Sequence, residues 1–165
     1  MVVAAGTLFA VALAASARSP RISTQNLFVI ERSKNANVVR YDARIQANGA
    51  LAAEQPVVAY WVLHEQQSQR KSLSFFDRRA YGFDVSRDAT GATTLVLEAA
   101  PDRPLRLVRR NGRVQARTNI AGQQAVLREI YVKSDESGWL PEVIYVELRG
   151  KTVQSGAPIT ERIEP

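Results

Sequence analysis

The feature that most constrains the fold of this chain is a regular succession of short strand-like segments separated by turn residues. They recur at a spacing of roughly ten residues and are rich in β-branched and aromatic side chains. Residues 38–46 show the pattern clearly, because Val39, Tyr41 and Ala43 alternate with charged side chains. The other segments span residues 26–32, 57–65, 80–85, 93–99, 105–110, 113–119, 125–133, 142–153 and 159–163. The chain is therefore expected to be all-β and to form a closed or nearly closed antiparallel, lipocalin-like barrel of about eight or nine strands. A two-sheet β-sandwich is the alternative.

The dipeptide Asn111-Gly112 is the strongest turn signal in the chain. Both central positions of a type I′ hairpin turn require positive φ, which Asn and Gly accept most readily. A two-residue turn here fixes the register of the segments on either side. It sets two pairs of arginines opposite each other, Arg110 with Arg113 and Arg106 with Arg117.

The length of 165 residues corresponds to one domain. Residues 1–17 carry no charged side chain and end in Ala15-Ser16-Ala17, the small-residue pattern of a signal-peptide cleavage site. We therefore expect a signal peptide over 1–17, a single exported β-domain over 18–165, and a periplasmic or secreted location. No apolar run reaches the roughly 20 residues that a membrane-spanning helix needs. At most one short helix is expected, near 67–79, and Gly150 is expected to mark a bulge or bend.

Reactive side chains are scarce, and this excludes several classes of protein. The chain has no Cys and a single His, His64, so disulfides, thiol nucleophiles and cysteine-based zinc sites are excluded. A serine triad would depend on His64, and no G-x-S-x-G motif supplies its nucleophile. Phosphate-cradling glycine loops are absent as well. We therefore expect no catalytic residues, no metal and no cofactor. An enzyme of an unfamiliar type would have to use His64, Glu147 or Lys34.

The region from 103 to 128 contains seven arginines and no acidic residue. Four of them share one face of the expected hairpin: Arg106, Arg110, Arg113 and Arg117. Like charges directly opposite each other destabilise a hairpin, so this face is solvated, neutralised by neighbouring acids, or bound to an anion. Glu129, Glu142 and Glu147 are the candidate acids. The bound anion would be a phosphate, a lipid headgroup or an envelope polymer. Nucleic acid is not an expected partner, because the aromatic residues lie mostly in other segments.

A second candidate site combines the turn after the first strand with nearby aromatic residues. The turn gathers cations and amides that suit an anionic group, while the aromatic residues carry rings that could line a barrel mouth. The candidate ligand-binding residues are Arg32, Lys34, Asn35, Asn37, Tyr41, Trp61 and Tyr81. In the alternative interpretation the amides only shape the turn and the rings only fill the core.

Several short motifs resemble a bacterial family of small exported domains of unknown function. They are Arg32-x-Lys34-Asn35-x-Asn37 followed by Tyr41, Tyr60-Trp61, Ala80-Tyr81-Gly82, and Tyr145-x-Glu147. The resemblance runs from Leu27 to about Ile163. It implies an all-β exported domain and no particular activity.

Taken together, these patterns favour a non-enzymatic binding module of the cell envelope for an anionic or amphipathic ligand. A structural component of the envelope, or one that docks on another protein, is the second hypothesis. An enzyme of an unfamiliar type is the third.

Overall fold

The computed structural model describes residues 21–135, 137–138 and 142–164. These residues form eleven strands, one α-helix and one short 3-10 helix. In chain order they are β1 (Ile22–Arg32), β2 (Asn35–Gln46), β3 (Val57–Leu63), η1 (His64–Gln66), β4 (Gln69–Ser72), α1 (Phe75–Tyr81), β5 (Phe83–Arg87), β6 (Thr93–Leu97), β7 (Ala100–Arg110), β8 (Arg113–Ile120), β9 (Gln123–Asp135), β10 (Glu142–Thr152) and β11 (Pro158–Ile163). Every segment predicted as a strand overlaps one of these, so the all-β prediction is confirmed. The predicted signal peptide lies outside the described residues.

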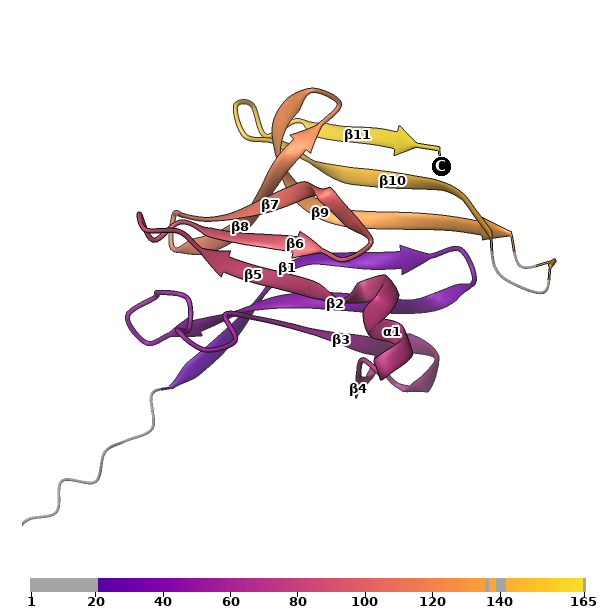
Figure 1. Cartoon of the computed structure of the whole chain (residues 1–165), viewed down its shortest axis with the longest axis horizontal. Coiled ribbons are helices and arrows are strands. Elements are labelled where there is room, and N and C mark those ends of the chain that lie inside the picture. The colour runs from indigo at the N-terminus through magenta and orange to yellow at the C-terminus, as the bar shows by residue number, and fades with distance from the viewer. Residues whose placement is uncertain (1–20, 136, 139–141, 165) are drawn as a thin grey trace, which may run out of the picture.

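The strands form two antiparallel meanders that meet side by side (Figure 1). One runs from β1 to β4 and the other from β5 to β9, which gives the order β4-β3-β2-β1-β9-β8-β7-β6-β5. The meanders join where β1 and β9 pair in parallel. The prediction of a purely antiparallel sheet is therefore wrong at this junction. A short turn forces an antiparallel direction, but no short turn links these two strands.

The connection between the two end strands explains why the sheet curls. Nine strands laid flat would separate β4 from β5 by about 38 Å, at about 4.8 Å per strand spacing. The chain joins these strands directly, through a linker that contains only α1. The sheet therefore curls until its ends approach each other. No strand pair closes the circle among the described residues, and a cavity of about 750 Å³ lies between β3 and β5. The predicted barrel is thus a half-barrel rather than a closed one.

β9 is the branch point of the sheet. One of its edges pairs with β10 along almost its whole length. Its other edge pairs first with β8, over Gln123–Val126, and then with β1, over Glu129–Val132. β1 and β8 diverge from this shared edge, and the Gln25 side chain spans the space between them. Its amide nitrogen donates to the Val114 carbonyl at 2.6 Å, and its oxygen accepts from the Val114 N–H at 3.0 Å.

The core fills the concave side of the curl. Phe28 of β1 stacks on Tyr41 of β2 with ring centroids 4.4 Å apart, and both side chains are fully buried. Leu95 of β6 and Leu127 of β9 are fully buried as well. The alternation predicted for residues 38–46 is confirmed on its apolar side, since Val39, Tyr41 and Ala43 have no exposed surface. On the charged side, however, Asp42 is buried as well.

The predicted turn at Asn111-Gly112 and the predicted bulge at Gly150 are confirmed, and the predicted helix is shifted along the chain. Asn111 and Gly112 both have positive φ, at 51° and 74°. The register of β9 and β10 shifts at Gly150, where a Cβ would lie 2.5 Å from a main-chain oxygen. The helix begins later than predicted, because residues 69–72 form strand β4 instead. Ser74 is its N-cap and forms a capping box with Asp77.

Candidate functional site

The arginines of the β7–β8 hairpin lie where the turn signal predicted them. Arg110 is paired with Arg113 and Arg106 with Arg117. They point away from the core, because the alternating residues Leu105, Leu107, Val114 and Ala116 are buried. The neighbouring strands extend this surface with two more cations. We call the resulting set the basic face: Arg106, Arg110, Arg113, Arg117, Arg128 and Lys151.

Strand register explains how Lys151 joins residues that are distant in sequence. Arg106 lies opposite Arg117, Arg117 opposite Val126, and Val126 opposite Lys151. This row across β7, β8, β9 and β10 therefore consists of three cations and one valine, which lies between Arg117 and Lys151. Arg128 lies two residues beyond Val126, at the register shift between β9 and β10.

A small hollow lies within the basic face. Its volume is about 200 Å³, below the roughly 300–1,000 Å³ typical of pockets for drug-sized molecules. Four cations line it, Arg110, Arg117, Arg128 and Lys151, and no carboxylate does. Gln115 also lines it and accepts from Arg117 Nε at 3.1 Å and from Nη2 at 2.8 Å, so it orients that guanidinium. The hollow has the size and charge to hold one small anionic group.

Within the described residues, none of the six cations forms an ion pair with a carboxylate. The charge of Arg106 acts on Asp88, at the margin of the basic face. Hydrogen bonds from Thr90 and from the Ala92 N–H already hold the Asp88 carboxylate and lower its pKa more than Arg106 does. The other cations of the basic face therefore keep charge that the protein does not neutralise.

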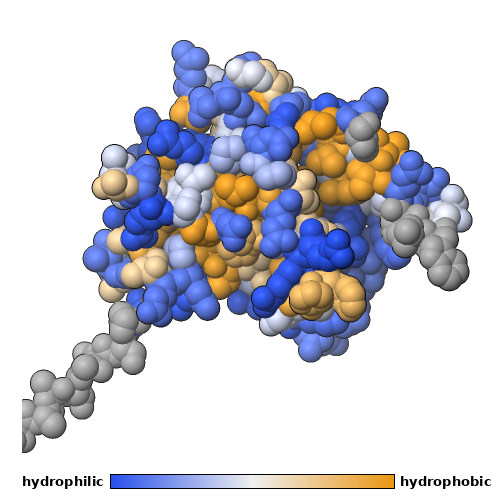
Figure 2. Space-filling model, viewed as in Figure 1, coloured by the Kyte–Doolittle hydropathy of each residue, from blue (hydrophilic) through white to orange (hydrophobic). Residues whose placement is uncertain are grey.

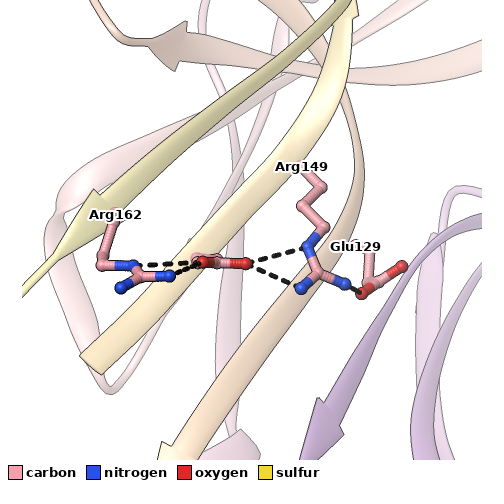
Figure 3. A network of polar contacts seen from close by, with 4 residues as sticks. Glu129, Arg149 and Arg162 are labelled. Carbon is pink, nitrogen blue, oxygen red and sulfur yellow. Dashed lines mark hydrogen bonds and ion pairs between the residues drawn. The ribbon is translucent and has the colours of Figure 1, made fainter. Parts of the chain in front are cut away.

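The acids expected to neutralise this face are used elsewhere. Glu147 lies between Arg149 and Arg162, at 2.7 Å and 2.6 Å, and Glu129 pairs with Arg149 at 2.5 Å (Figure 3). Hydrogen bonds from Arg149 and then Arg162 lower the pKa of Glu147. Arg149 and Arg162 also lie over the Tyr131 and Tyr145 rings. Glu142, the third candidate acid, is exposed at the start of β10.

Arg103 also belongs to the predicted arginine run, but unlike the arginines of the basic face it is paired with an acid. Its two terminal nitrogens bind both carboxylate oxygens of Glu161, at 3.0 Å and 2.5 Å. The hydrogen bonds from Arg103 lower the pKa of Glu161, as does that from the Ala121 N–H. Arg109 points to the other face of β7 and packs against Gly49. The paired Arg103 thus lies beside unpaired arginines of the basic face, since it lines a hollow with Glu161, Arg106 and Arg117.

The second predicted site is brought together only in part. The Arg32 guanidinium lies 4.7 Å from the centroid of the Trp61 ring, and Tyr81 packs edge-on against Trp61 at 5.2 Å. Burial raises the pKa of Tyr81, whereas the charge and hydrogen bond of Arg32 oppose this shift. Arg32 Nε is buried without a hydrogen-bond partner, and the facing aromatic ring stabilises its charge. This cluster fixes the end of α1 on the barrel.

The other residues of that site serve the turn and the core. Asn35 accepts from the Asn37 N–H, as in an Asx-turn, and the Asn37 amide reaches Glu65 at 3.5 Å. Lys34 is exposed on the same turn. Tyr41 is fully buried and donates to the Tyr81 carbonyl at 2.7 Å, so it offers no surface to a ligand. A ligand role for this turn stays a prediction.

The side chains considered for an enzyme lie in different elements of the structure. His64 is exposed in η1 and lies 3.2 Å from Ser68 Oγ, whereas Glu147 is held between two arginines on β10. The described part of the chain contains no cluster of three or more potential metal-ligating side chains. It also contains no helix long and apolar enough to cross a membrane.

Sequence reasoning missed two residues of the basic face, Arg128 and Lys151. It also missed Gln115, which orients Arg117. Arg128 was in the arginine run but had no assigned face, because the bulge that positions it depends on Gly150 and β10. Lys151 could be found only from the register of β9 with β10. No local signal in the sequence specifies that register.

Comparison with protein families matches residues 28–162 to a model described as "Domain of unknown function (DUF4833)". This range is close to the one over which the sequence resembles a family of unknown function. No curated protein and no solved structure matches the chain.

Proposed function

The chain belongs to the DUF4833 family of domains of unknown function, and from the geometry of its basic face we propose that it is a non-enzymatic binding module for a polyanionic, phosphate-bearing ligand. The family description names no activity, so the proposal is based on the site alone. The resemblance to exported domains, together with the apolar residues 1–17, supports a place in the cell envelope.

One observation carries this proposal: among the described residues, several arginines bind a carboxylate, whereas no cation of the basic face does. Arg103, Arg149 and Arg162 each bind a carboxylate. The basic face holds six cations, and its hollow has no carboxylate in its lining. Two arginine pairs face each other directly across β7 and β8, which costs stability. A bound anion would relieve that repulsion.

The chemistry of the cations favours phosphate. A guanidinium presents parallel N–H groups that can bind two phosphate oxygens at once. Gln115 fixes Arg117 in one orientation, which lowers the entropy that its ordering would cost. The hollow accepts a single anionic group, while the two remaining cations, Arg106 on β7 and Arg113 on β8, suit further charges. Such repeated charge is found on phosphate-bearing envelope polymers and on arrays of lipid headgroups.

Isothermal titration calorimetry with inorganic tripolyphosphate tests the proposal. The double variant Arg110→Gln/Arg113→Gln should bind at least about tenfold more weakly than wild type, because it removes two charge-assisted contacts. Its affinity should also depend less on salt, since fewer charges remain to be screened. Arg44→Gln/Arg87→Gln is the matched control, because it removes the same charge from outside the basic face and should bind like wild type.

A parallel titration with phosphatidylglycerol vesicles distinguishes a soluble phosphate polymer from a headgroup array. If Arg110→Gln/Arg113→Gln weakens binding to the vesicles more than binding to long-chain polyphosphate at equal phosphate, the ligand of the basic face is a headgroup array. The reverse identifies a polymer. Equal affinity of wild type and Arg110→Gln/Arg113→Gln for both probes would show that the basic face does not bind anions.

An interaction protein of the envelope is the second candidate, and one observation favours it. Among the described strands β5 pairs with β6 alone, and its other edge borders the cavity between β5 and β3. A free strand edge can pair with an extended segment of another protein. A stoichiometric protein partner that binds with no small anion present would favour this role over the first.

A further inference from the structure

The most exposed apolar side chains of the described residues are two adjacent phenylalanines on α1. Phe75 is 79% exposed and Phe76 81% exposed, and their rings lie edge to face at 5.8 Å. Adjacent helix residues point about 100° apart, so both can be exposed only where the first turn of the helix protrudes. Figure 2 shows this apolar tip over α1, beside strongly hydrophilic atoms.

The two phenylalanines of α1 point to solvent rather than to the core. Asp77 and Tyr81, one turn apart, are half-buried and face the barrel. Phe75, Phe76 and Arg79 are exposed away from that side, and Arg78 is exposed at the mouth of the cavity between β3 and β5. The apolar residues of this short helix therefore point to solvent, followed one turn later by two cations. No described residue of the chain covers the two rings.

The base of this tip is rigid. The Ser74 N–H donates to Asp77 at 2.8 Å, and the Asp77 N–H donates to Ser74 Oγ at 3.2 Å, which caps the first turn. Tyr81 packs on Trp61 at the other end, and Tyr41 binds the Tyr81 carbonyl. The two rings are therefore displayed on a fixed support.

Exposed cations flank the tip along the chain. Arg78 and Arg79 follow it on α1, and Lys71 precedes it on β4, close enough for its charge to act on Asp77. The acid within the helix, Asp77, is held by the capping box, and Glu98 lines the same cavity as Arg78. With Arg70, residues 69–81 carry four cations and one acid. An apolar tip flanked by cations complements a bilayer with anionic headgroups.

The area of the tip also favours a bilayer over a protein. A stable protein interface buries about 800 Å² on each partner. Two aromatic side chains can bury about 300–500 Å² together. A bilayer accepts a small convex tip, because lipids rearrange around it and need no matching surface.

We propose that α1 docks the protein on an anionic bilayer by inserting Phe75 and Phe76 below the headgroups, with Lys71, Arg78 and Arg79 among the phosphates. This docking is independent of the basic face, which lies on the outer side of β7 to β10. A bilayer contact at α1 would hold the exported protein at the envelope surface.

An environment-sensitive fluorophore at position 80 tests this, and the absence of native Cys makes single-site labelling clean. The full chain carries Ala80→Cys labelled with nitrobenzoxadiazole, and the probe is vesicles of phosphatidylcholine with or without one quarter phosphatidylglycerol. The label reports insertion of α1 itself, whatever else binds the vesicle. We expect the emission maximum of the label to shift to shorter wavelength with the anionic vesicles. A label at Ala53→Cys in the β2–β3 loop should show no such blue shift.

The decisive variant is Phe75→Ser/Phe76→Ser in the labelled chain. It should abolish the blue shift or raise the required lipid concentration at least about tenfold. Val143→Ser/Ile144→Ser removes two exposed apolar side chains from β10 and should leave the shift unchanged. Tripolyphosphate binding should be unaffected in Phe75→Ser/Phe76→Ser, which separates this proposal from that for the basic face. A label that stays in water with anionic vesicles, or an unchanged shift in the serine variant, would overturn bilayer docking and leave a protein as the occupant of the tip.

Discussion

At the scale of single residues, the molecule treats its arginines in two ways. Arg149 and Arg162 share the carboxylate of Glu147 (Figure 3). Arg110 and Arg113 instead face each other across the hairpin with no acid to separate them. Paired arginines thus stabilise the fold, whereas unpaired arginines keep N–H groups that can bind a ligand. Strand register decides which role these arginines have, because it determines the residue that lies opposite each one on the neighbouring strand.

The repulsion between Arg110 and Arg113 predicts that stability and binding oppose each other at this position. Arg113→Glu should replace a like-charge pair with an attractive one. We expect it to raise the free energy of unfolding by about 0.5 kcal/mol and to weaken tripolyphosphate binding. Thermal unfolding at low salt measures the first effect, with Arg113→Gln expected to lie between wild type and Arg113→Glu. A lower unfolding midpoint in Arg113→Glu would contradict the view that this pair is repulsive.

Glu161 predicts how stability depends on pH. Arg103 lowers its pKa in the folded state below the ordinary value of 4.5. Such a carboxylate contributes stability above the unfolded pKa and loses it as pH falls through the folded pKa. Wild type should therefore lose stability as pH falls below about 4.5. Glu161→Gln should be less stable than wild type at pH 7, and this difference should shrink at pH 3.

Urea midpoints of both proteins at pH 7 and pH 3 check this linkage. Glu164→Gln, which changes an exposed acid near the C-terminus, is the control and should follow wild type. A constant difference between Glu161→Gln and wild type at the two pH values would show that the ion pair with Arg103 does not shift the titration.

At the scale of elements, the position of β1 beside β8 depends on one side chain. Gln25 makes two hydrogen bonds with Val114 where main-chain pairing between the strands is lost. Gln25→Ala leaves both main-chain groups of Val114 without these partners, and should cost about 1–3 kcal/mol of stability. Gln123→Ala, at an exposed glutamine, should cost less than about 0.5 kcal/mol.

Hydrogen exchange locates that effect. The Val114 N–H should exchange faster in Gln25→Ala, while amides of β3 keep their wild-type protection. Unchanged protection at Val114 would mean that β1 and β8 are held together without the glutamine.

At the scale of the whole molecule, the sequence predicted what local chemistry decides. The Asn111-Gly112 turn fixed the register of β7 and β8 and therefore the four arginines of the hairpin. The pairing of β1 with β9 could not be predicted, because it joins residues about a hundred positions apart and no turn specifies it. The register of β10 on β9, which no local signal specifies, brings Arg128 and Lys151 into the basic face and places Arg149 opposite Glu129.

The opening of the barrel is a second property of the whole molecule. Strand patterns predicted a closed or nearly closed barrel, since they report alternation and not the spacing between distant edges. α1 lies in the linker between β4 and β5, and the edges of β3 and β5 stay apart (Figure 1). The half-barrel thus leaves its core packed while it presents two different surfaces, the basic face on the outside of β7 to β10 and the tip of α1.

A nuclear magnetic resonance titration of the arginine Nε–H groups with tripolyphosphate tests most directly whether the basic face binds anions. We expect shifts at Arg110, Arg113 and Arg117, which have no carboxylate partner among the described residues, and constant positions for Arg103, Arg149 and Arg162, which have one. Equal shifts in both sets, or none in the first, would contradict the claim that the basic face is the binding surface of this protein.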